Sequence, residues 1–384
     1  MSRRVAMYFF YLVSGCAPVF AQDTTRLSMM FVGDIMQHDS QRAAAYDTLT
    51  EAYDYSSCFQ FVRPYLDSAD LTIGNLEVTL AGRPYSGYPQ FSAPDELALT
   101  LKDVGFDALV TANNHCEDRG RKGLERTIMM LDSLNIPHTG TFADTVDRLN
   151  DYPLLIQRNG FTLAILNYTY GTNGMPVSKP NMVNLIDTAL IKMDLIKARD
   201  FNTDAVVVFM HWGTEYQSAA NRFQKDVADL CFRYGAKLVI GAHPHVLQPM
   251  EWRKESDQLV AYSLGNFVSG QRNRYTDGGA MLTIELEKIT QTDSSSATRI
   301  SNANYDLAWV YRTSGKNKKY FILPAGDFEG IISEGGSAEP PKFNLSVSDK
   351  KAFQLFLDDS RALFKKKNIE INERPKSETV PIEN

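Results

Sequence analysis

Gly241-Ala242-His243-Pro244-His245 directly follows an aliphatic run from Lys237 to Ile240. A compact aliphatic run that ends in glycine and polar residues is typical of a buried β-strand. Two histidines two positions apart on an extended segment face the same side, and Pro244 restricts the backbone between them. Neutral imidazoles are good ligands for divalent transition metals. The stretch therefore predicts a metal site at the end of a strand.

Similar polar clusters close other hydrophobic runs along the chain. They are Phe31-Val32-Gly33-Asp34, Gly74-Asn75-Leu76-Glu77, Asn113-Asn114-His115 and His211-Trp212-Gly213. Ordinary turn chemistry is the structural alternative for the Gly-Asp pair and for the Asn-Asn-His cluster. Histidines that served only for packing would be scattered, so the gathering of imidazoles, amides and carboxylates at strand ends indicates metal-assisted hydrolysis. His138 lacks this setting, and we interpret it as structural.

The hydrophobic runs alternate with helical patterns, which is typical of an α/β protein with a largely buried sheet. The expected strands are 27–32, 71–73, 108–111, 163–167, 205–210, 237–240 and 259–264. The expected helices are 94–104, 123–134, 188–199 and 221–234. In such sheets, binding sites gather at the carboxyl ends of the strands, where the polar clusters lie.

After Gly278 the pattern changes to one of antiparallel strands at the sheet edge. These strands are expected at 280–287, 307–312 and 320–324. Ser333 to Lys342 has the composition of a linker, and Ser348 to Lys367 predicts an added helix capped by Ser348. We expect the polar end to be disordered from about Asn372. The predicted organisation is a signal peptide at 1–21, one domain at 22–332, and a linker, helix and flexible tail at 333–384.

The N-terminus has the pattern of an export signal. Arg3-Arg4 precedes an apolar stretch from Val5 to Val13, and Val19-Phe20-Ala21 offers a small-residue cleavage site before Gln22. The alternative is a lipoprotein signal at Val13-Ser14-Gly15-Cys16, with a lipid on the cysteine. Either pattern predicts a protein exported to the periplasm or cell envelope.

Composition excludes some classes of function. The chain has 384 residues, is 43% hydrophobic and carries a formal charge of -6, so its core can be large and no basic surface for nucleic acid is expected. The cysteines left after cleavage are Cys58, Cys116 and Cys231. Their odd number and wide spacing predict no disulfide framework.

Taken in order, these motifs resemble those of the CapA family, the poly-gamma-glutamate capsule synthesis proteins. The resemblance covers about Leu27 to Glu287. The segments that carry it are Gly33-Asp34-Ile35-Met36, Gly74-Asn75-Leu76-Glu77, Phe91-Ser92-Ala93-Pro94, Ala112-Asn113-Asn114-His115 with Asp118 and Gly120, His211-Trp212-Gly213-Thr214-Glu215, Gly241-Ala242-His243-Pro244-His245-Val246-Leu247-Gln248 and Tyr262-Ser263-Leu264-Gly265-Asn266-Phe267.

That family is similar in turn to calcineurin-like metallophosphoesterases. The resemblance implies an α/β, metallo-dependent phosphatase-like sandwich of two β-sheets flanked by helices, with one or two divalent ions (Mn, Fe, Zn or Mg). It implies metal ligands at Asp34, Glu77, Asn114, His211, His243 and His245. It also implies catalytic roles for His115 and Asp118, with the histidine assisting the leaving group. The remaining site predictions are substrate contacts at Asn75, Glu215, Asn266 and Arg119.

Three departures from the phosphoesterase pattern put a second metal in doubt. Met36 stands where a histidine ligand is usual, and His38 is displaced by two positions. Glu77 lies in the segment where an aspartate normally bridges two metals. Cys116 replaces the acidic residue that would orient His115, so Glu117 or Asp118 would have to substitute for it.

These departures leave two functions open. The first is an exported, metal-dependent hydrolase that acts on an envelope polymer or on a small phosphoester or amide substrate, alongside the capsule synthesis machinery. The second is a non-catalytic, metal-binding assembly factor for an envelope polymer. Metal stoichiometry and turnover distinguish the two.

Overall fold

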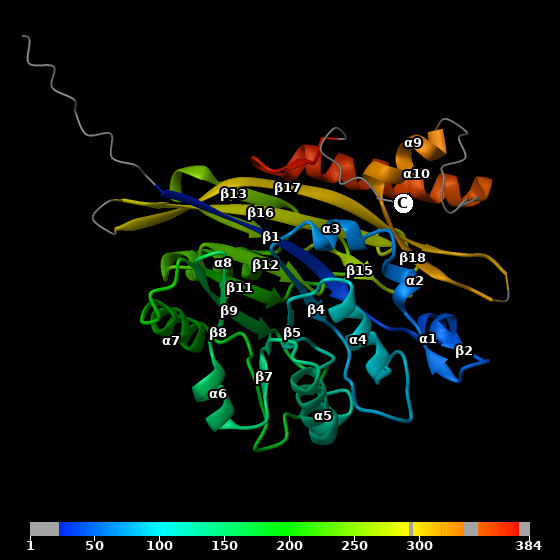
Figure 1. The fold of residues 1–384 in the computed structure, drawn as a ribbon, viewed down its shortest axis with the longest axis horizontal. Coiled ribbons are helices and arrows are strands. Elements are labelled where there is room, and N and C mark those ends of the chain that lie inside the picture. Colours follow the sequence, from blue (N-terminus) through cyan, green and yellow to red (C-terminus); the bar gives the residue numbers. More distant parts are fainter. Residues whose placement is uncertain (1–22, 292–294, 316, 334–344, 376–384) are drawn as a thin grey trace, which may run out of the picture.

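The computed structural model describes residues 23–291, 295–315, 317–333 and 345–375. Two β-sheets stack face to face and helices cover them (Figure 1). The larger sheet has nine strands, β1 (Asp23–Ile35), β4 (Leu71–Leu76), β5 (Ala108–Val110), β6 (His138–Thr139), β15 (Asn266–Val268), β16 (Gly278–Thr290), β17 (Ser296–Arg312), β18 (Tyr320–Pro324) and β19 (Asn372–Glu373). Its order is β18-β17-β16-β1-β4-β5-β6, with β15 paired to β1 and β19 paired to β17.

The smaller sheet has six strands in the order β13-β14-β12-β11-β9-β8. Its strands are β8 (Leu154–Arg158), β9 (Phe161–Thr169), β11 (Ala205–His211), β12 (Leu238–Ala242), β13 (Met250–Arg253) and β14 (Gln258–Ala261). Two short pairs lie outside both sheets, β2 (Tyr46–Asp47) with β3 (Ala52–Tyr53) and β7 (Thr141–Phe142) with β10 (Met182–Val183). The central strands of both sheets are parallel, so their carboxyl ends meet at one edge of the sandwich.

Helices flank the two sheets. They are α1 (Asp39–Ala45), α2 (Ser56–Phe59), α3 (Arg63–Asp67), α4 (Asp95–Asp103), α5 (Gly120–Ser133), α6 (Thr145–Asp151), α7 (Thr188–Arg199), α8 (Arg222–Arg233), α9 (Ala325–Ser333) and α10 (Val347–Lys367), with a 3-10 turn η1 (Lys254–Ser256). Local sequence explains several of their starts. Asp187 accepts hydrogen bonds from the first turn of α7, and Asn221 forms a reciprocal capping box with Gln224 at the start of α8.

Strand alternation places apolar side chains in three layers. In β1, Phe31 faces the other sheet and its ring lies 5.7 Å from that of Phe209 in β11, whereas Val32 faces the helices. In β11, Val208 faces the helices on the opposite side, where α7 and α8 pack. Because the side-chain period of a strand is two, near-continuous apolar runs such as these bury both faces of a sheet. This confirms the predicted α/β sandwich of two sheets flanked by helices.

The C-terminal helix is part of the core. Phe353 and Phe364 of α10 pack against Trp309 and Tyr305 of β17, at ring separations of 5.5 and 4.7 Å. The prediction of Ser348 as the cap is wrong, because Ser346 accepts the capping hydrogen bond from the Asp349 backbone.

The polar end is ordered further than predicted. Asn372 and Glu373 form β19 and pair with Asn304 and Tyr305. The prediction that disorder begins at about Asn372 is therefore wrong for these two residues. The predicted signal peptide, Cys16 and nearly all of the predicted linker lie outside the described residues, as does the tail from 376 onward.

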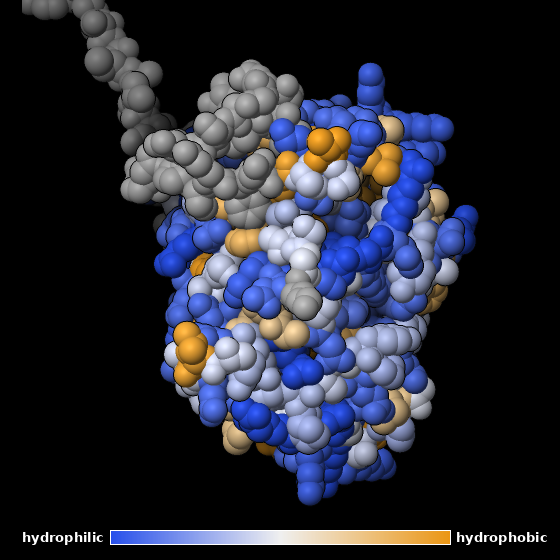
Figure 2. Space-filling model, turned by 90° about the vertical axis from the view of Figure 1, so that its right-hand side faces the viewer, coloured by the Kyte–Doolittle hydropathy of each residue, from blue (hydrophilic) through white to orange (hydrophobic). Residues whose placement is uncertain are grey.

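Among the described residues, every helix is too short or too polar to cross a membrane. Figure 2 shows one face of the molecule, and its described part is mostly hydrophilic with hydrophobic residues in small separate groups. Scattered hydrophobic residues of this kind are normal on a globular surface.

Candidate metal centre

The polar clusters predicted from the sequence meet at the carboxyl ends of strands from both sheets. Asp34 is the second-last residue of β1, His211 ends β11, and Asn75 lies in β4. The others lie in the loops after their strands: Glu77 after β4, Asn114 after β5, and His243 and His245 after β12. All seven side chains are buried. The fold therefore gathers in one place donors that are far apart in the sequence.

Asp34 is the anchor of this centre. Its carboxylate accepts hydrogen bonds from the Asn75 side-chain amide at 2.9 Å and from the His243 backbone N–H at 3.2 Å, and it lies 3.0 Å from the Nδ1 atom of His245. Gly33 allows this placement, since a Cβ there would lie 1.9 Å from the Gly265 carbonyl oxygen. The adjacent glycine is therefore a requirement of the close approach between β1 and β15.

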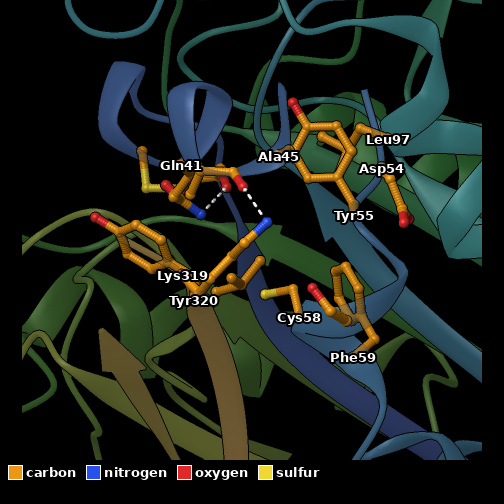
Figure 3. Close-up of a pocket in the computed structure, with 13 residues that line it drawn as sticks. Gln41, Ala45, Asp54, Tyr55, Cys58, Phe59, Leu97, Lys319 and Tyr320 are labelled. Atoms are coloured by element: carbon orange, nitrogen blue, oxygen red, sulfur yellow. Dashed lines mark hydrogen bonds between the residues drawn. The ribbon is translucent and has the colours of Figure 1, made fainter. Parts of the chain in front are cut away.

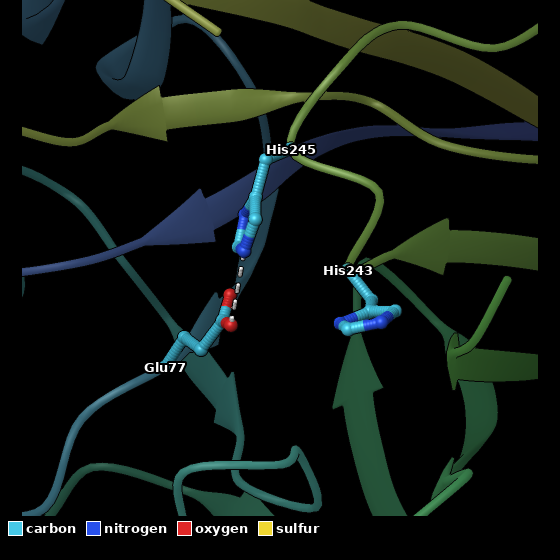
Figure 4. A group of neighbouring side chains, drawn as sticks. All are labelled: Glu77, His243 and His245. Carbon is cyan, nitrogen blue, oxygen red and sulfur yellow. Dashed lines mark ion pairs between the residues drawn. The ribbon is translucent and has the colours of Figure 1, made fainter. Parts of the chain in front are cut away.

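Glu77 lies between the histidines. Its Oε1 atom is 3.6 Å from His211 Nε2 and 3.8 Å from His245 Nε2, and this buried oxygen accepts no hydrogen bond among the described residues. Figure 4 shows the His245 ring directed at the Glu77 carboxylate, with His243 standing to one side. Two donor groups share Glu77: one with His243 and His245, and one with Asp34 and His211, each with ligand atoms within 4.8 Å of one another.

The histidine loop after β12 has an unusual backbone. His243 has φ +96° and His245 has φ +58°, in a region that residues other than glycine rarely occupy. Such conformations persist only where the surrounding structure fixes them, and they are common at functional sites. Here the hydrogen bond from the His243 backbone to Asp34 and the contact of His245 with Asn266 Oδ1, at 3.1 Å, hold the loop.

His211 is oriented by two amides. Its Nε2 atom lies 2.7 Å from Asn114 Oδ1, and its Nδ1 atom lies 3.2 Å from the Asn75 side-chain nitrogen. An amide oxygen only accepts and an amide nitrogen only donates, so this geometry fits a neutral ring protonated on Nε2. Asn114 Oδ1 thus accepts the hydrogen bond from His211 Nε2, and binding of an ion through Nε2 would require this proton to move.

Burial and mutual charge set the protonation of the centre. Burial lowers the pKa of His243 to about 3 and that of His211 well below its usual value, so both rings are neutral ligands near pH 7. Burial and then the charge of Asp34 raise the pKa of Glu77 well above its usual value. Burial disfavours ionised Asp34, but the hydrogen bond and charge of His245 outweigh it and hold the Asp34 pKa below its usual range.

These observations fit a divalent cation. Glu77 Oε1 and His243 Nδ1 are both buried without a hydrogen-bond partner among the described residues, which is costly unless something else satisfies them. Two carboxylates and neutral imidazoles match the preferences of Mn, Fe or Zn. Asp34, Glu77, His211, His243 and His245 are therefore the residues that would hold such an ion.

His115 and Asp118 form a pair at the edge of the centre. The Nδ1 atom of His115 lies 2.7 Å from the Asp118 carboxylate, which also accepts the backbone N–H of Phe91 at 2.7 Å. The Phe91 ring packs edge-on against His115 at 4.7 Å. Asp118 thus orients His115 in place of the acidic residue that Cys116 replaces. The Nε2 atom of His115 is then available for proton transfer.

Met36 and His38 lie outside the donor set. Met36 faces the helices and lines a largely apolar pocket with Cys58, Phe59 and Leu97, part of which is seen in Figure 3. His38 lies before α1, where its Nδ1 atom accepts the Gly270 backbone N–H at 3.1 Å. Neither residue replaces the histidine ligand that phosphoesterases usually have at this point.

The predicted substrate contacts fall into two groups. Asn75 and Asn266 are buried among the donors, hydrogen-bonded to Asp34 and in contact with His245, respectively. Glu215 is exposed, and Arg119 is half-buried and donates to the Pro84 carbonyl at 3.2 Å. The first two therefore support the donors, and the last two lie at the surface.

Two residues near the centre, Tyr170 and Asn173, were not predicted from the sequence, and Asn113 belonged to a predicted cluster without a role of its own. Tyr170 follows β9, and its ring lies 4.5 Å from that of His243. Asn173 accepts hydrogen bonds from the Asn114 amide at 3.1 Å and from the Tyr170 hydroxyl at 3.3 Å. Asn113 donates to the Leu76 carbonyl at 2.8 Å and ties β4 to the segment after β5. The position of Tyr170 directly after a strand is the one signal that could have indicated its place.

Sequence comparison identifies relatives over most of the chain. The family model described as "Bacterial capsule synthesis protein PGA_cap" matches residues 28–271. Capsule biosynthesis protein CapA of Bacillus anthracis is 32% identical over 285 residues, covering 70% of this chain and 66% of that protein. PGA biosynthesis protein CapA of Bacillus subtilis (strain 168) is 30% identical over 275 residues, covering 68% of each. The match thus spans about two thirds of these relatives.

Among solved structures, a phosphatase from Mycoplasma pneumoniae aligns with a TM-score of 0.42 and 15% identity, covering 74% of this chain and 94% of that one. The resemblance to the CapA proteins is confirmed by the sequence matches, which span all the strand-end clusters from Asp34 to His245. This chain belongs to the bacterial capsule synthesis protein family PGA_cap.

Proposed function

We propose that this protein is an exported, divalent-metal-dependent hydrolase of capsule synthesis, acting on a phosphoester or amide bond of an envelope polymer or of a small precursor. The observation that carries this proposal is the joint placement of two features. A buried donor set surrounds Glu77, and the His115–Asp118 pair lies at its edge. Poly-gamma-glutamate is the polymer suggested by the name of the Bacillus subtilis relative.

The residues have separable roles in such a reaction. A bound divalent cation would polarise the oxygen of the scissile group and lower the pKa of a water molecule. Asp34 and Glu77 supply the negative charge that holds the cation, and Asn75 fixes the orientation of Asp34. His115 donates a proton to the leaving group from Nε2, while Asp118 holds the ring by Nδ1. Phe91 packs against His115 and limits the access of water on that side.

A second function is supported by the neutral Asn75. Its amide nitrogen, not a carboxylate, faces Asp34 and His211. With Met36 also outside the donor set, the centre has fewer ligands than a two-metal phosphoesterase is expected to have. A metal-binding assembly factor for the polymer, without turnover, is the alternative that this observation favours.

An assay of substrate turnover distinguishes the hydrolase from the assembly factor. We expect the purified protein, loaded with manganese or zinc, to hydrolyse p-nitrophenyl phosphate, bis(p-nitrophenyl) phosphate or poly-gamma-glutamate, and to lose this activity with a chelator. Re-addition of the metal should restore it. A metal-loaded protein that turns over none of these substrates, nor others in a broad phosphoester and amide screen, would favour the assembly factor.

Export is a separate proposal with its own test. We expect the mature protein to begin near Gln22 and to accumulate outside the cytoplasmic membrane. Intact-mass measurement of the native protein distinguishes the two signals, because simple cleavage leaves unmodified or cyclised Gln22 and a lipoprotein carries an acylated Cys16. A full-length product in the cytoplasm would contradict both.

A further inference from the structure

The segment after β9 reaches the metal centre through one tight turn. Thr172-Asn173-Gly174-Met175 is closed by a hydrogen bond from the Met175 backbone N–H to the Thr172 carbonyl at 2.9 Å. Asn173 and Gly174 have φ of +51° and +75°. Positive φ at both central residues defines a type I′ turn, and Asn-Gly is the dipeptide that such turns prefer. The local sequence therefore explains the backbone that presents the Asn173 side chain.

Asn173 connects two side chains of the centre. Its Oδ1 atom accepts hydrogen bonds from the Asn114 amide at 3.1 Å and from the Tyr170 hydroxyl at 3.3 Å. The Tyr170 ring lies 4.5 Å from the His243 ring and stacks nearly parallel to that of His211, at 6.3 Å and 11°. Asn173 is exposed, whereas Asn114 is buried. The turn therefore holds a buried amide of the centre from the solvent side.

The hydrogen bonds of the centre form one chain that begins at Asp34. An ionised carboxylate only accepts hydrogen bonds, and Asp34 accepts one from the Asn75 amide nitrogen at 2.9 Å. The same nitrogen lies 3.2 Å from His211 Nδ1, so it donates its other proton there and leaves the His211 proton on Nε2. His211 Nε2 lies 2.7 Å from Asn114 Oδ1, which accepts this proton. Each bond thus fixes the donor and the acceptor of the next one.

Asn173 lies at the outer end of this chain. With its oxygen directed at His211, Asn114 directs its NH2 group at the turn, and Asn173 Oδ1 accepts one of these protons. A flipped Asn114 amide would set two oxygens against each other at Asn173 and two donors against each other at His211. The orientation matters for a metal, because an amide oxygen can bind a divalent ion and the NH2 group cannot.

We propose that Asn173 is a positioning residue of the metal centre. It holds the Asn114 amide with its oxygen towards His211, so that an ion that replaces the His211 proton meets an oxygen and not an NH2 group. The inference rests on the metal centre of the proposed function and adds to it a residue outside the donor set. Partners behind a metal ligand typically change metal affinity by about 10 to 100-fold. We expect the lower end of this range, because Asn173 is exposed and water can partly replace its oxygen.

Asn173→Gly tests the side chain and leaves the turn intact. Glycine adopts a positive φ without steric cost, so this variant keeps the backbone and loses the oxygen. We expect it to bind manganese or zinc about tenfold more weakly than the wild type, as measured by competition with a chromophoric chelator. Asn173→Asp should bind the metal at least as tightly as the wild type, since a carboxylate oxygen still accepts from Asn114. Full affinity in Asn173→Gly, or an equal loss in both variants, would overturn the inference.

Asn159→Gly is the matched control. Asn159-Gly160 forms the corresponding turn at the other end of β9, between β8 and β9, with φ of +48° and +76°. Asn159 is exposed, and its replacement makes the same change in the same backbone conformation. The metal affinity of this variant should equal that of the wild type. An equal loss in Asn159→Gly and Asn173→Gly would assign the effect to the turns and contradict the role of Asn173.

Hydrogen exchange of the Asn114 side-chain amide tests the inference without metal. In the metal-free protein, the Asn114 proton that Asn173 accepts should exchange with solvent about tenfold more slowly in the wild type than in Asn173→Gly, as measured by NMR. If the wild type bound no divalent ion, the proposed function would fail, and this measurement would still decide whether Asn173 holds Asn114. Equal exchange rates in the two proteins would rule out the positioning role.

Discussion

Joint replacement of His243 and His245 by alanine is expected to remove most of the bound divalent metal and to leave the domain folded. Both imidazoles offer ligand atoms within 4.8 Å of Glu77 and of one another. His243 Nδ1 has no hydrogen-bond partner among the described residues. Loss of a supporting group behind a ligand typically costs about 10 to 100-fold in metal affinity, so loss of two ligands should cost at least about 100-fold.

The fold should survive because neither histidine belongs to the apolar layers. β12 ends at Ala242, before the pair, and its apolar residues Leu238 and Ile240 are unchanged. Removing His245 also removes its contact with Asp34, which we expect to cost about 1–3 kcal/mol of stability. Both positions keep their left-handed backbone, which alanine tolerates no better than histidine.

Elemental analysis and circular dichroism of the same preparations measure the two effects. His138→Ala is the matched control, since His138 lies in β6 and its Nδ1 atom contacts the Ile136 carbonyl at 3.0 Å. This variant should keep its metal. If the double variant retained full metal content, the pair could not be the ligands assigned here.

Much of this architecture could be predicted because it depends on local patterns. Each central strand of the sandwich is an apolar run in the sequence. Successive side chains of a strand point to opposite faces, so Phe31 faces the other sheet and Val32 faces the helices. Parallel strands bring their carboxyl ends to one edge, so the clusters ending at Asp34, His211 and His245 had to converge once the strands were placed.

What could not be predicted depends on contacts between segments far apart in the sequence. Asp118 was one of two candidates to orient His115, and the choice is made by the turn that also presents it to the Phe91 backbone. Tyr170 belongs to no recognisable sequence motif, and its contact with the His243 ring depends on the path of the loop after β9. The start of the tail is ordered because β17 offers a free pairing edge to Asn372, which composition does not reveal.

The role of His115 is expected to appear as a loss of turnover with little loss of metal. The His115 ring is not among the grouped donors, and Asn114 supplies the amide oxygen beside His211 instead. Its Nδ1 atom is held by Asp118, so Nε2 is the atom free to exchange a proton. Losing a general acid typically costs about 10² to 10⁴ in rate, and we expect His115→Ala to fall in this range.

The size of the loss should depend on the leaving group. A good leaving group such as p-nitrophenolate departs without protonation, so His115→Ala should be least impaired on its esters and most impaired on alkyl esters. Asp118→Asn is the companion variant, because it keeps the size of the side chain but weakens its hold on Nδ1, and it should show the same trend with a smaller loss. Metal content and rates across a leaving-group series measure both variants. An unchanged rate of His115→Ala on alkyl esters would exclude the proton-donor role, because those substrates need the proton most.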